Sequence, residues 1–588
     1  MEQFLDAQRA VMTAFLDGHS APAALPPELF AALDFALPDS EPSIAQLSEA
    51  DKPLCLIGSI VHHEPGREIV CRRVMDEHED RYVDDHTLGG RGVSRVDPGQ
   101  NGLPILPMTF SLEAMAQAAQ LLAPGKVVVA IRNVRMLRWL PFDPEPTTLE
   151  VRATVSVADP ETGVVEVKAN VRDLGNIFVR DGADKAACEA IIVLADQYPE
   201  PPEPLPFVLT AEQPCRSTVE DLRRNMFHGP LFQMIRSLGR TGREGIEGTL
   251  EVQSRDLWFR SDPDPRVAID PVLVDAAMHI LGAWHLEQPD WSGRILLPIG
   301  VNRIEFFGPI PPVGALLQLR GHNEEETARQ VRHGVELFAP DGRLWFRMTG
   351  ASYWRFYLPF GDVNFFGPKD QYYLSTRCQA AEPTAAEKAP RCYFLDPPAD
   401  LQQPVLRASG VRVTMTAREI AEFNAWTGTD AARSNWFFGR LVAKDAVRAA
   451  WGERYGGGTF PADIETHEVD GRIVCTPRGE AGPELFPPVA VAICEGKVVA
   501  FSAFAERVGC AIQVVPKNAT VDAERAARAQ VACAAVANAF FIPVESCQLE
   551  SLDAESGAAV VNASGNPLRV RTARQKDAVV ATTMCEGA

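Results

Sequence analysis

A segment that is apolar on nearly every helical face follows Pro107 and requires a buried position. Its apolar residues repeat at helical spacing, namely Phe110, Met115, Ala118, Leu121 and Leu122. A helix that is apolar on most faces belongs in a core. Pro107 suits a helix start, because the first helical residue needs no N–H partner. Upstream, His86 leads into a glycine-rich turn. The sequence therefore predicts a histidine at a strand end, above a tunnel whose floor is this helix.

The same order of elements occurs a second time. β-branched, strand-like runs precede and follow the first helix, and a second helix spans residues 269–288. Asp270 is a good N-cap for it and Pro271 a good first helical residue. Further strands are expected at DLWFRS before this helix and in four runs after it, from RILLPIGV to GRLWFRMTG. One long helix wrapped by antiparallel strands is the hot-dog pattern, so two copies predict an α+β double hot-dog.

Composition limits the class of protein. The 588 residues include 46% apolar and 23% charged residues, which indicates a globular chain of about two to four domains. The net charge of −21 argues against a nucleic-acid partner. The 12 cysteines form no C-x-x-C pair, so neither a disulfide framework nor a zinc site is expected. A signal peptide and a membrane-length apolar run are also not apparent. We expect a cytoplasmic protein.

Segment boundaries follow from these patterns. We assign residues 1–50 to an N-terminal helix (2–17) and linker, 51–205 to the first hot-dog and 206–375 to the second. The Ala/Glu/Pro-rich residues 376–390 are expected to be a linker, and 391–588 a separate domain. The N-terminal helix resembles segments that follow the acyltransferase in multidomain synthases. It is either a trace of a larger assembly or a peripheral helix of this protein.

Residues 51–375 resemble the dehydratases of polyketide synthases and polyunsaturated-fatty-acid-type synthases. The family's first motif has a histidine, a glycine four residues later and then a proline; His86 and Gly90 match, but the proline is displaced to Pro107. The second motif reads Pro271, Asp275, His279, and HGPLF around His228 and Phe232 also matches. The resemblance implies dehydration of a 3-hydroxyacyl thioester on a phosphopantetheine arm to the trans enoyl thioester, with no cofactor.

The chemistry requires two groups of opposite role. Neutral His86 is expected to remove the α proton, and Asp275 to protonate the departing β-hydroxyl, since an apolar pocket favours the protonated carboxyl. His279, one helical turn beyond Asp275, would orient that acid or the hydroxyl. The helix start from Pro107 to Thr109 is the candidate donor to the thioester oxygen, although Thr109 itself has no distinctive role.

Substrate contacts are expected at Gly90, Pro107, Pro271 and Phe232. Simpler interpretations stay open: His86 as a core histidine, Asp275 and His279 as an ordinary helix-face pair, and HGPLF as a tight turn before a strand.

The C-terminal region resembles phosphopantetheinyl transferases. GRLVAKDAVRAA, with Lys444 and Asp445, is similar to their R-x-x-A-K-E-A helix, and RAQVACAAVANA from Arg528 repeats it with Cys533 and Ala534 at those places. The family's metal-binding aspartate and glutamate fall on Ala511 and Gln513, and its Ser-His pair on Ile493 and Cys494. Apolar groups do not hold the Mg²⁺ that this transfer needs. We therefore predict an inactive transferase-like α/β domain that binds a carrier protein or serves as structure.

Two alternatives compete with this interpretation. One is an active transferase whose metal site is built by Asp445, Asp463 and Glu465. The other is a non-catalytic scaffold that holds acyl carrier proteins. The partners implied by the resemblance are an acyl carrier protein or carrier domain and other synthase domains, with a homodimer as a candidate assembly, and no nucleic acid or membrane.

Overall fold

The computed structural model describes residues 53–142, 146–175, 186–288, 294–357, 369–478 and 486–585. Leu54–Ala588 form one unit by themselves. The predicted helix at 2–17 and the linker after it lie outside the described residues. In the described part of the chain, no helix is both long and apolar enough to cross a lipid bilayer.

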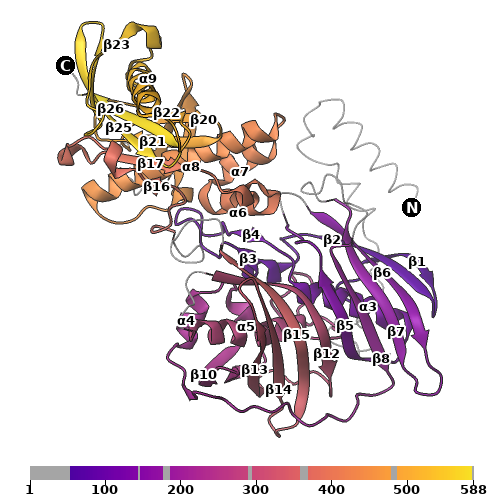
Figure 1. Ribbon diagram of the computed structural model, residues 1–588. Helices are drawn as coiled ribbons and strands as arrows, with labels where there is room; N and C mark the ends of the chain where they lie inside the picture. The colour runs from indigo at the N-terminus through magenta and orange to yellow at the C-terminus, as the bar shows by residue number, and fades with distance from the viewer. Residues whose placement is uncertain are drawn as a thin grey trace, which may run out of the picture. The chain divides into compact units, whose positions relative to one another are not determined.

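The first helix-and-sheet unit surrounds α3 (Met108–Leu122). Its strands are β1 (Ser59–Glu64), β2 (Glu68–Met75), the short pair β3 (Thr87–Leu88) and β4 (Leu103–Pro104), and then β5 (Val127–Met136), β6 (Thr147–Ala158), β7 (Val165–Asp173) and β8 (Cys188–Ala195). Helix α3 contacts β2, β5, β6, β7 and β8 (Figure 1). Nearly every α3 side chain is buried, which confirms the expected buried helix, although polar Thr109, Ser111, Glu113 and Gln117 are buried with the apolar residues. Pro107 is its N-cap and Met108 its first residue, so the helix begins one position later than expected.

The second unit repeats this plan around α5 (Pro271–Leu286). Its other elements are β9 (Gln213–Pro214), α4 (Val219–Arg224), β10 (Ile235–Gly242), β11 (Gly245–Glu251), β12 (Arg294–Phe306), β13 (Leu316–Glu326), β14 (Gln330–Phe338) and β15 (Leu344–Tyr357). Asp270 caps α5 by accepting from the Leu273 N–H at 2.9 Å, and Pro271 is the first helical residue, as predicted. The strand expected at DLWFRS was wrong. Trp258 there is buried in an irregular segment whose backbone bonds the 79–82 region instead.

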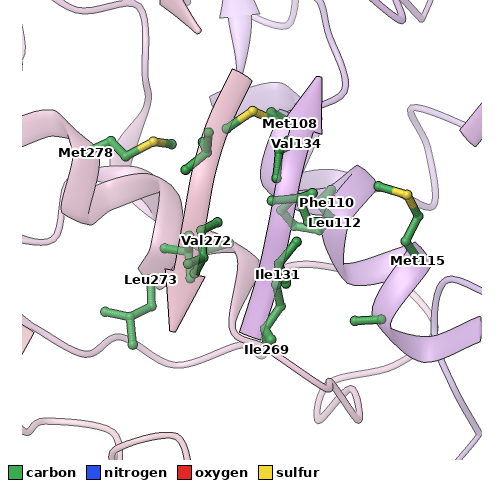
Figure 2. Packing of buried hydrophobic residues seen from close by; sticks show 14 of the residues in the cluster. Met108, Phe110, Leu112, Met115, Ile131, Val134, Ile269, Val272, Leu273 and Met278 are labelled. Atoms are coloured by element: carbon green, nitrogen blue, oxygen red, sulfur yellow. The ribbon is translucent and has the colours of Figure 1, made fainter. Parts of the chain in front are cut away.

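The two helix-and-sheet units, around α3 and α5, share one antiparallel sheet. Its order is β1-β2-β6-β7-β8-β5-β12-β15-β14-β13-β11-β10-β9, so β5 and β12 join the halves. Phe110 and Leu112 of α3 and Val272 of α5 lie beside Ile131 and Val134 of β5 in the shared core (Figure 2). This arrangement confirms the α+β double hot-dog and brings the two central helices into contact.

The C-terminal region, residues 369–585, contains two helix-on-sheet halves. The first has β16 (Thr376–Arg377), β17 (Arg391–Leu395), α6 (Pro404–Thr414), α7 (Ala417–Asn424), α8 (Asp430–Tyr455), β18 (Ile464–Val469), β19 (Arg472–Pro477), β20 (Val489–Cys494) and β21 (Lys497–Ser502). The second has β22 (Arg507–Val514), α9 (Val521–Phe540), β23 (Cys547–Leu552), β24 (Ala558–Ala563), β25 (Asn566–Gln575) and β26 (Ala578–Cys585). Helix α8 packs on β17, β20 and β21, and α9 on the second sheet, so the two similar sequences at 439–450 and 528–539 form corresponding helices.

Residues 376–390 differ from the expected linker. Strand β16 pairs with β17, and Cys378 and Ala381 are buried against the second half. The Ala/Glu/Pro-rich composition was misleading, because short turns and a two-residue strand here bury small side chains.

Candidate active site

His86 follows the short 3-10 turn Arg81–Asp85 and precedes β3. Its Nδ1 lies 2.6 Å from the carbonyl oxygen of Ile105. A carbonyl only accepts, so Nδ1 carries the ring proton and Nε2 keeps its lone pair. Burial lowers the pKa of His86 below its usual value, against the opposing effect of the Asp275 charge. The imidazole is therefore neutral at neutral pH and able to take a proton at Nε2.

Asp275 lies in the middle of α5 and is 5% exposed. Its Oδ1 is 3.2 Å from Nε2 of His279, one turn further along the helix, and 3.5 Å from Nε2 of His228. The hydroxyl of Thr109 donates to Oδ2 at 3.3 Å. The carboxyl thus receives contacts from both central helices and from the HGPLF segment, which fixes its orientation.

These groups converge although they come from distant segments. A ring nitrogen of His86, one of His228 and an Asp275 oxygen all lie within 4.8 Å of one another. His86, His228, Asp275 and His279 line one cavity of about 140 Å³. Most of the other lining is apolar, from Leu88, Ile105, Leu106, Met108, Met136, Trp139, Met226, Phe227, Met278, Leu281, Leu296, Leu297 and Pro298. The arrangement presents a neutral imidazole and a carboxyl group to an apolar space.

His228 belongs to this site, which the tight-turn interpretation missed. Its ring centroid is 4.1 Å from that of His279 and 5.1 Å from that of His86. Burial, together with the two neighbouring imidazoles, lowers the pKa of His228 well below its usual value. The sequence signal was a histidine before a Gly-Pro turn and two flanking phenylalanines, which the structure packs around His86. His86, His228 and Asp275 also form one of two groups of described residues that could hold a metal ion; the other is His62, Glu64 and Glu68.

Asp85 fastens the HGPLF segment beside His86. Its carboxylate accepts from the Leu231 N–H at 2.8 Å, and its carbonyl from the Gly229 N–H at 2.8 Å. A Cβ on Gly229 would meet the Asp85 carboxylate at 2.2 Å, so only glycine allows this approach. Asp85, which directly precedes the expected base His86, therefore positions His228.

The four expected substrate contacts have other surroundings. Among the described residues, the cavity lining does not include Gly90, Pro107, Pro271 or Phe232. Gly90 has a φ of +79° in the turn after β3, and the buried Phe232 ring packs at 5.5 Å from His86. Pro107 is the N-cap of α3, and Pro271 is the first residue of α5. A direct role in substrate binding stays a prediction for these residues.

The start of α3 is available as a hydrogen-bond donor. The N–H groups of Phe110 and Ser111 both bond to the Pro107 carbonyl oxygen. Those of Met108 and Thr109 have no intrahelical partner, as for any first helical turn. Met108, the first residue of this helix, lines the cavity.

The three C-terminal carboxylates do not share a site. Asp445 accepts from the Ser375 hydroxyl at 2.6 Å and from Arg448 at 3.1 Å. Glu465 pairs with Arg418, whereas Asp463 bonds the segment around Ser94. Metal-compatible groups found in the described ranges include none of the three. In this part of the chain, the three carboxylates of the alternative metal site each have partners of their own.

Comparison with protein families matches residues 211–356 to the family described as polyketide synthase dehydratase N-terminal domain. Solved structures similar to this chain include the dehydratase domain from the CurJ module of curacin polyketide synthase, with 14% identity, 53% of this chain and 96% of that chain covered and a TM-score of 0.37. The dehydratase domain of RzxB from Pseudomonas fluorescens shows 18% identity, coverage of 51% and 98%, and a TM-score of 0.36. The dehydratase domain of a mycocerosic acid synthase-like polyketide synthase shows 17%, 51% and 95%, and 0.36. Comparison with curated proteins gives no significant match.

Proposed function

We propose that residues 54–357 form a dehydratase that removes water from a 3-hydroxyacyl thioester. The observation that carries the proposal is the convergence of His86 and Asp275 on one apolar cavity from separate halves of the double hot-dog. The family match to residues 211–356 supports the same reaction class, because that segment holds Asp275, His228 and His279.

We propose a role for each group. Nε2 of His86 takes the proton from the α carbon, and the electron pair of that C–H bond forms the new double bond. The β carbon–oxygen bond breaks while Asp275 donates its proton to the departing oxygen, which leaves as water. A proton then returns from the His86 imidazolium to the Asp275 carboxylate. N–H groups at the start of α3 stabilise the negative charge that develops on the thioester oxygen.

The cavity favours an acyl chain. Its lining combines many apolar side chains with a few polar groups gathered at one place, which is the usual composition of a small-molecule site. We propose that the substrate arrives on the phosphopantetheine arm of an acyl carrier protein or carrier domain, alongside other synthase domains. The chemistry as proposed uses only the chain's own acid and base.

The test is mass spectrometry of a carrier-linked 3-hydroxyacyl thioester incubated with the intact protein. We expect the loss of one water from one hydroxyl stereoisomer and the reverse hydration of the matching enoyl thioester. If neither stereoisomer is dehydrated and the enoyl thioester is not hydrated, the non-catalytic scaffold replaces this proposal.

We further propose that the C-terminal region is a non-catalytic, transferase-like domain that supports the active site. The residues at 89–102, here called the 89–102 loop, lie between β3 and β4 and account for the displaced proline. Oδ1 of Asp463 accepts from the Ser94 hydroxyl at 2.6 Å and from the N–H groups of Arg95 and Val96 at 2.9 and 3.3 Å. The side-chain amide of Gln100 donates to two carbonyl oxygens at the end of α6, at 2.7 and 3.1 Å.

Apolar contacts reach the cavity wall itself. Leu88, Ile105 and Trp139 line the cavity and also pack with the C-terminal hydrophobic cluster. Ile105 supplies the carbonyl that orients His86. This continuity favours a supporting role for the C-terminal region. Titration with coenzyme A and Mg²⁺ tests the competing transferase: we expect no Mg²⁺-dependent binding, and such binding would restore the transferase hypothesis.

A further inference from the structure

The hydroxyl of Tyr353 is a buried polar group without a hydrogen-bond partner among the described residues. Tyr353 is 6% exposed on β15, and it lines the same cavity as His86 and Asp275. Both the backbone and the ring of Tyr353 have defined neighbours. It pairs with Pro298 of β12 and Val331 of β14, and its ring lies 5.8 Å from that of His333.

An unpaired buried hydroxyl destabilises a protein, since the group loses its hydrogen bonds to water and gains none. Phenylalanine would fill the same volume without that loss. Because this hydroxyl is on the wall of a cavity, a bound ligand could accept the hydrogen bond that the described residues do not accept. The cavity is where the proposed substrate would bind, so the acceptor is to be sought on that substrate.

We propose that Tyr353 is a further catalytic residue, whose hydroxyl donates a hydrogen bond to the β-hydroxyl oxygen of the bound 3-hydroxyacyl thioester. This inference rests on the proposed dehydratase function and names the group that recognises the hydroxyl. The β oxygen is the favoured acceptor because Tyr353 lines the same cavity as Asp275, the group expected to protonate that oxygen. Burial raises the pKa of Tyr353, which keeps the phenol protonated and a donor.

Tyr353 keeps its proton throughout the reaction. Asp275 supplies the proton that leaves with the β oxygen as water, and His86 receives the α proton. The tyrosine hydrogen bond holds the oxygen in line with Asp275 and stabilises its growing negative charge as the carbon–oxygen bond lengthens. An enoyl product and a saturated acyl chain lack this oxygen. The site should therefore prefer a 3-hydroxyacyl thioester over a saturated one of equal length.

The matched variants are Tyr353→Phe and Tyr82→Phe. Tyr82 is also fully buried with an unpartnered hydroxyl, but it does not line the cavity. Both substitutions remove one buried hydroxyl, so neither should lower the Tm. We expect only Tyr353→Phe to lower kcat, by about a hundredfold, as removal of a donor that acts in the transition state does.

A binding measurement separates this inference from the proposed reaction. Calorimetry in a His86→Ala background would compare 3-hydroxyacyl and saturated acyl phosphopantetheine thioesters, and it needs no turnover. We expect Tyr353→Phe to weaken binding of the 3-hydroxyacyl thioester about tenfold and to leave the saturated thioester unchanged. Equal effects on both thioesters, or no effect on either, would overturn the role of Tyr353. If the intact protein shows no dehydratase activity but Tyr353→Phe still selectively weakens binding of the 3-hydroxyacyl thioester, the proposed reaction is overturned and the role of Tyr353 in binding stands.

Discussion

Asp463 offers the sharpest test of how the C-terminal region supports the site. Asp463→Ala removes the acceptor of three hydrogen bonds from the 89–102 loop. Bonds to a charged group contribute about 1.5–3 kcal/mol each, and these three share one oxygen, so we expect a loss of about 3 kcal/mol. Glu465→Ala is the matched control. Its pair with Arg418 is partly exposed, and such pairs contribute about 1 kcal/mol or less.

The assay is amide hydrogen exchange of the 89–102 loop and of the adjoining β4. A loss of about 3 kcal/mol corresponds to exchange about a hundredfold faster. Because Ile105 follows β4 and orients His86, dehydration should slow in the same variant. Exchange in Asp463→Ala that equals the wild type, or that equals Glu465→Ala, would refute the supporting role.

Three further predictions concern the site itself. Gly229→Ala should lower the free energy of unfolding by about 1–3 kcal/mol, because its Cβ displaces the Asp85 carboxylate. An unchanged midpoint of urea unfolding would contradict the close packing of Asp85 against the HGPLF segment. Thr109→Val should reduce kcat/KM about tenfold, since it removes the hydroxyl that donates to Asp275, and unchanged kinetics would make that contact incidental. The acid limb of kcat/KM should lie below pH 6.5, the usual pKa of histidine, because His86 stays neutral when folded. The unfolded chain binds that proton first, so the contribution of His86 to stability falls as the pH drops below 6.5, and an acid limb above 6.5 would contradict the lowered pKa.

The sequence predicts the two central helices well because each carries strong local signals. Asp270 and Pro271 fix the start of α5, and the apolar faces of α3 leave a buried position as its only suitable place. The i,i+4 spacing places Asp275 and His279 on one face of a helix, and the resemblance to the dehydratase family singles them out. The start and the buried face of a helix depend on residues within one segment, so they can be predicted from the local sequence pattern.

Contacts between segments were not accessible in the same way. The sequence pattern gives Thr109 no distinctive role, yet its hydroxyl donates to Asp275 on the other helix. The pattern around His228 indicates a turn, whereas an isolated bridge to His86 carries it into the site. For Asp463, strand alternation indicates a face but not what covers that face, so the sequence leaves a metal ligand open there. These roles arise from pairings of residues more than a hundred positions apart, which no local period encodes.

The most direct test compares the intact protein with His86→Ala and Asp275→Asn on one carrier-linked 3-hydroxyacyl thioester. Mass spectrometry follows the loss of water, and circular dichroism verifies that both variants are folded. We predict conversion to the enoyl thioester by the intact protein and at least a hundredfold slower conversion by each variant, as expected when a general base or acid is removed. Undiminished water loss in either folded variant would contradict the assignment of the base and acid on which the account depends.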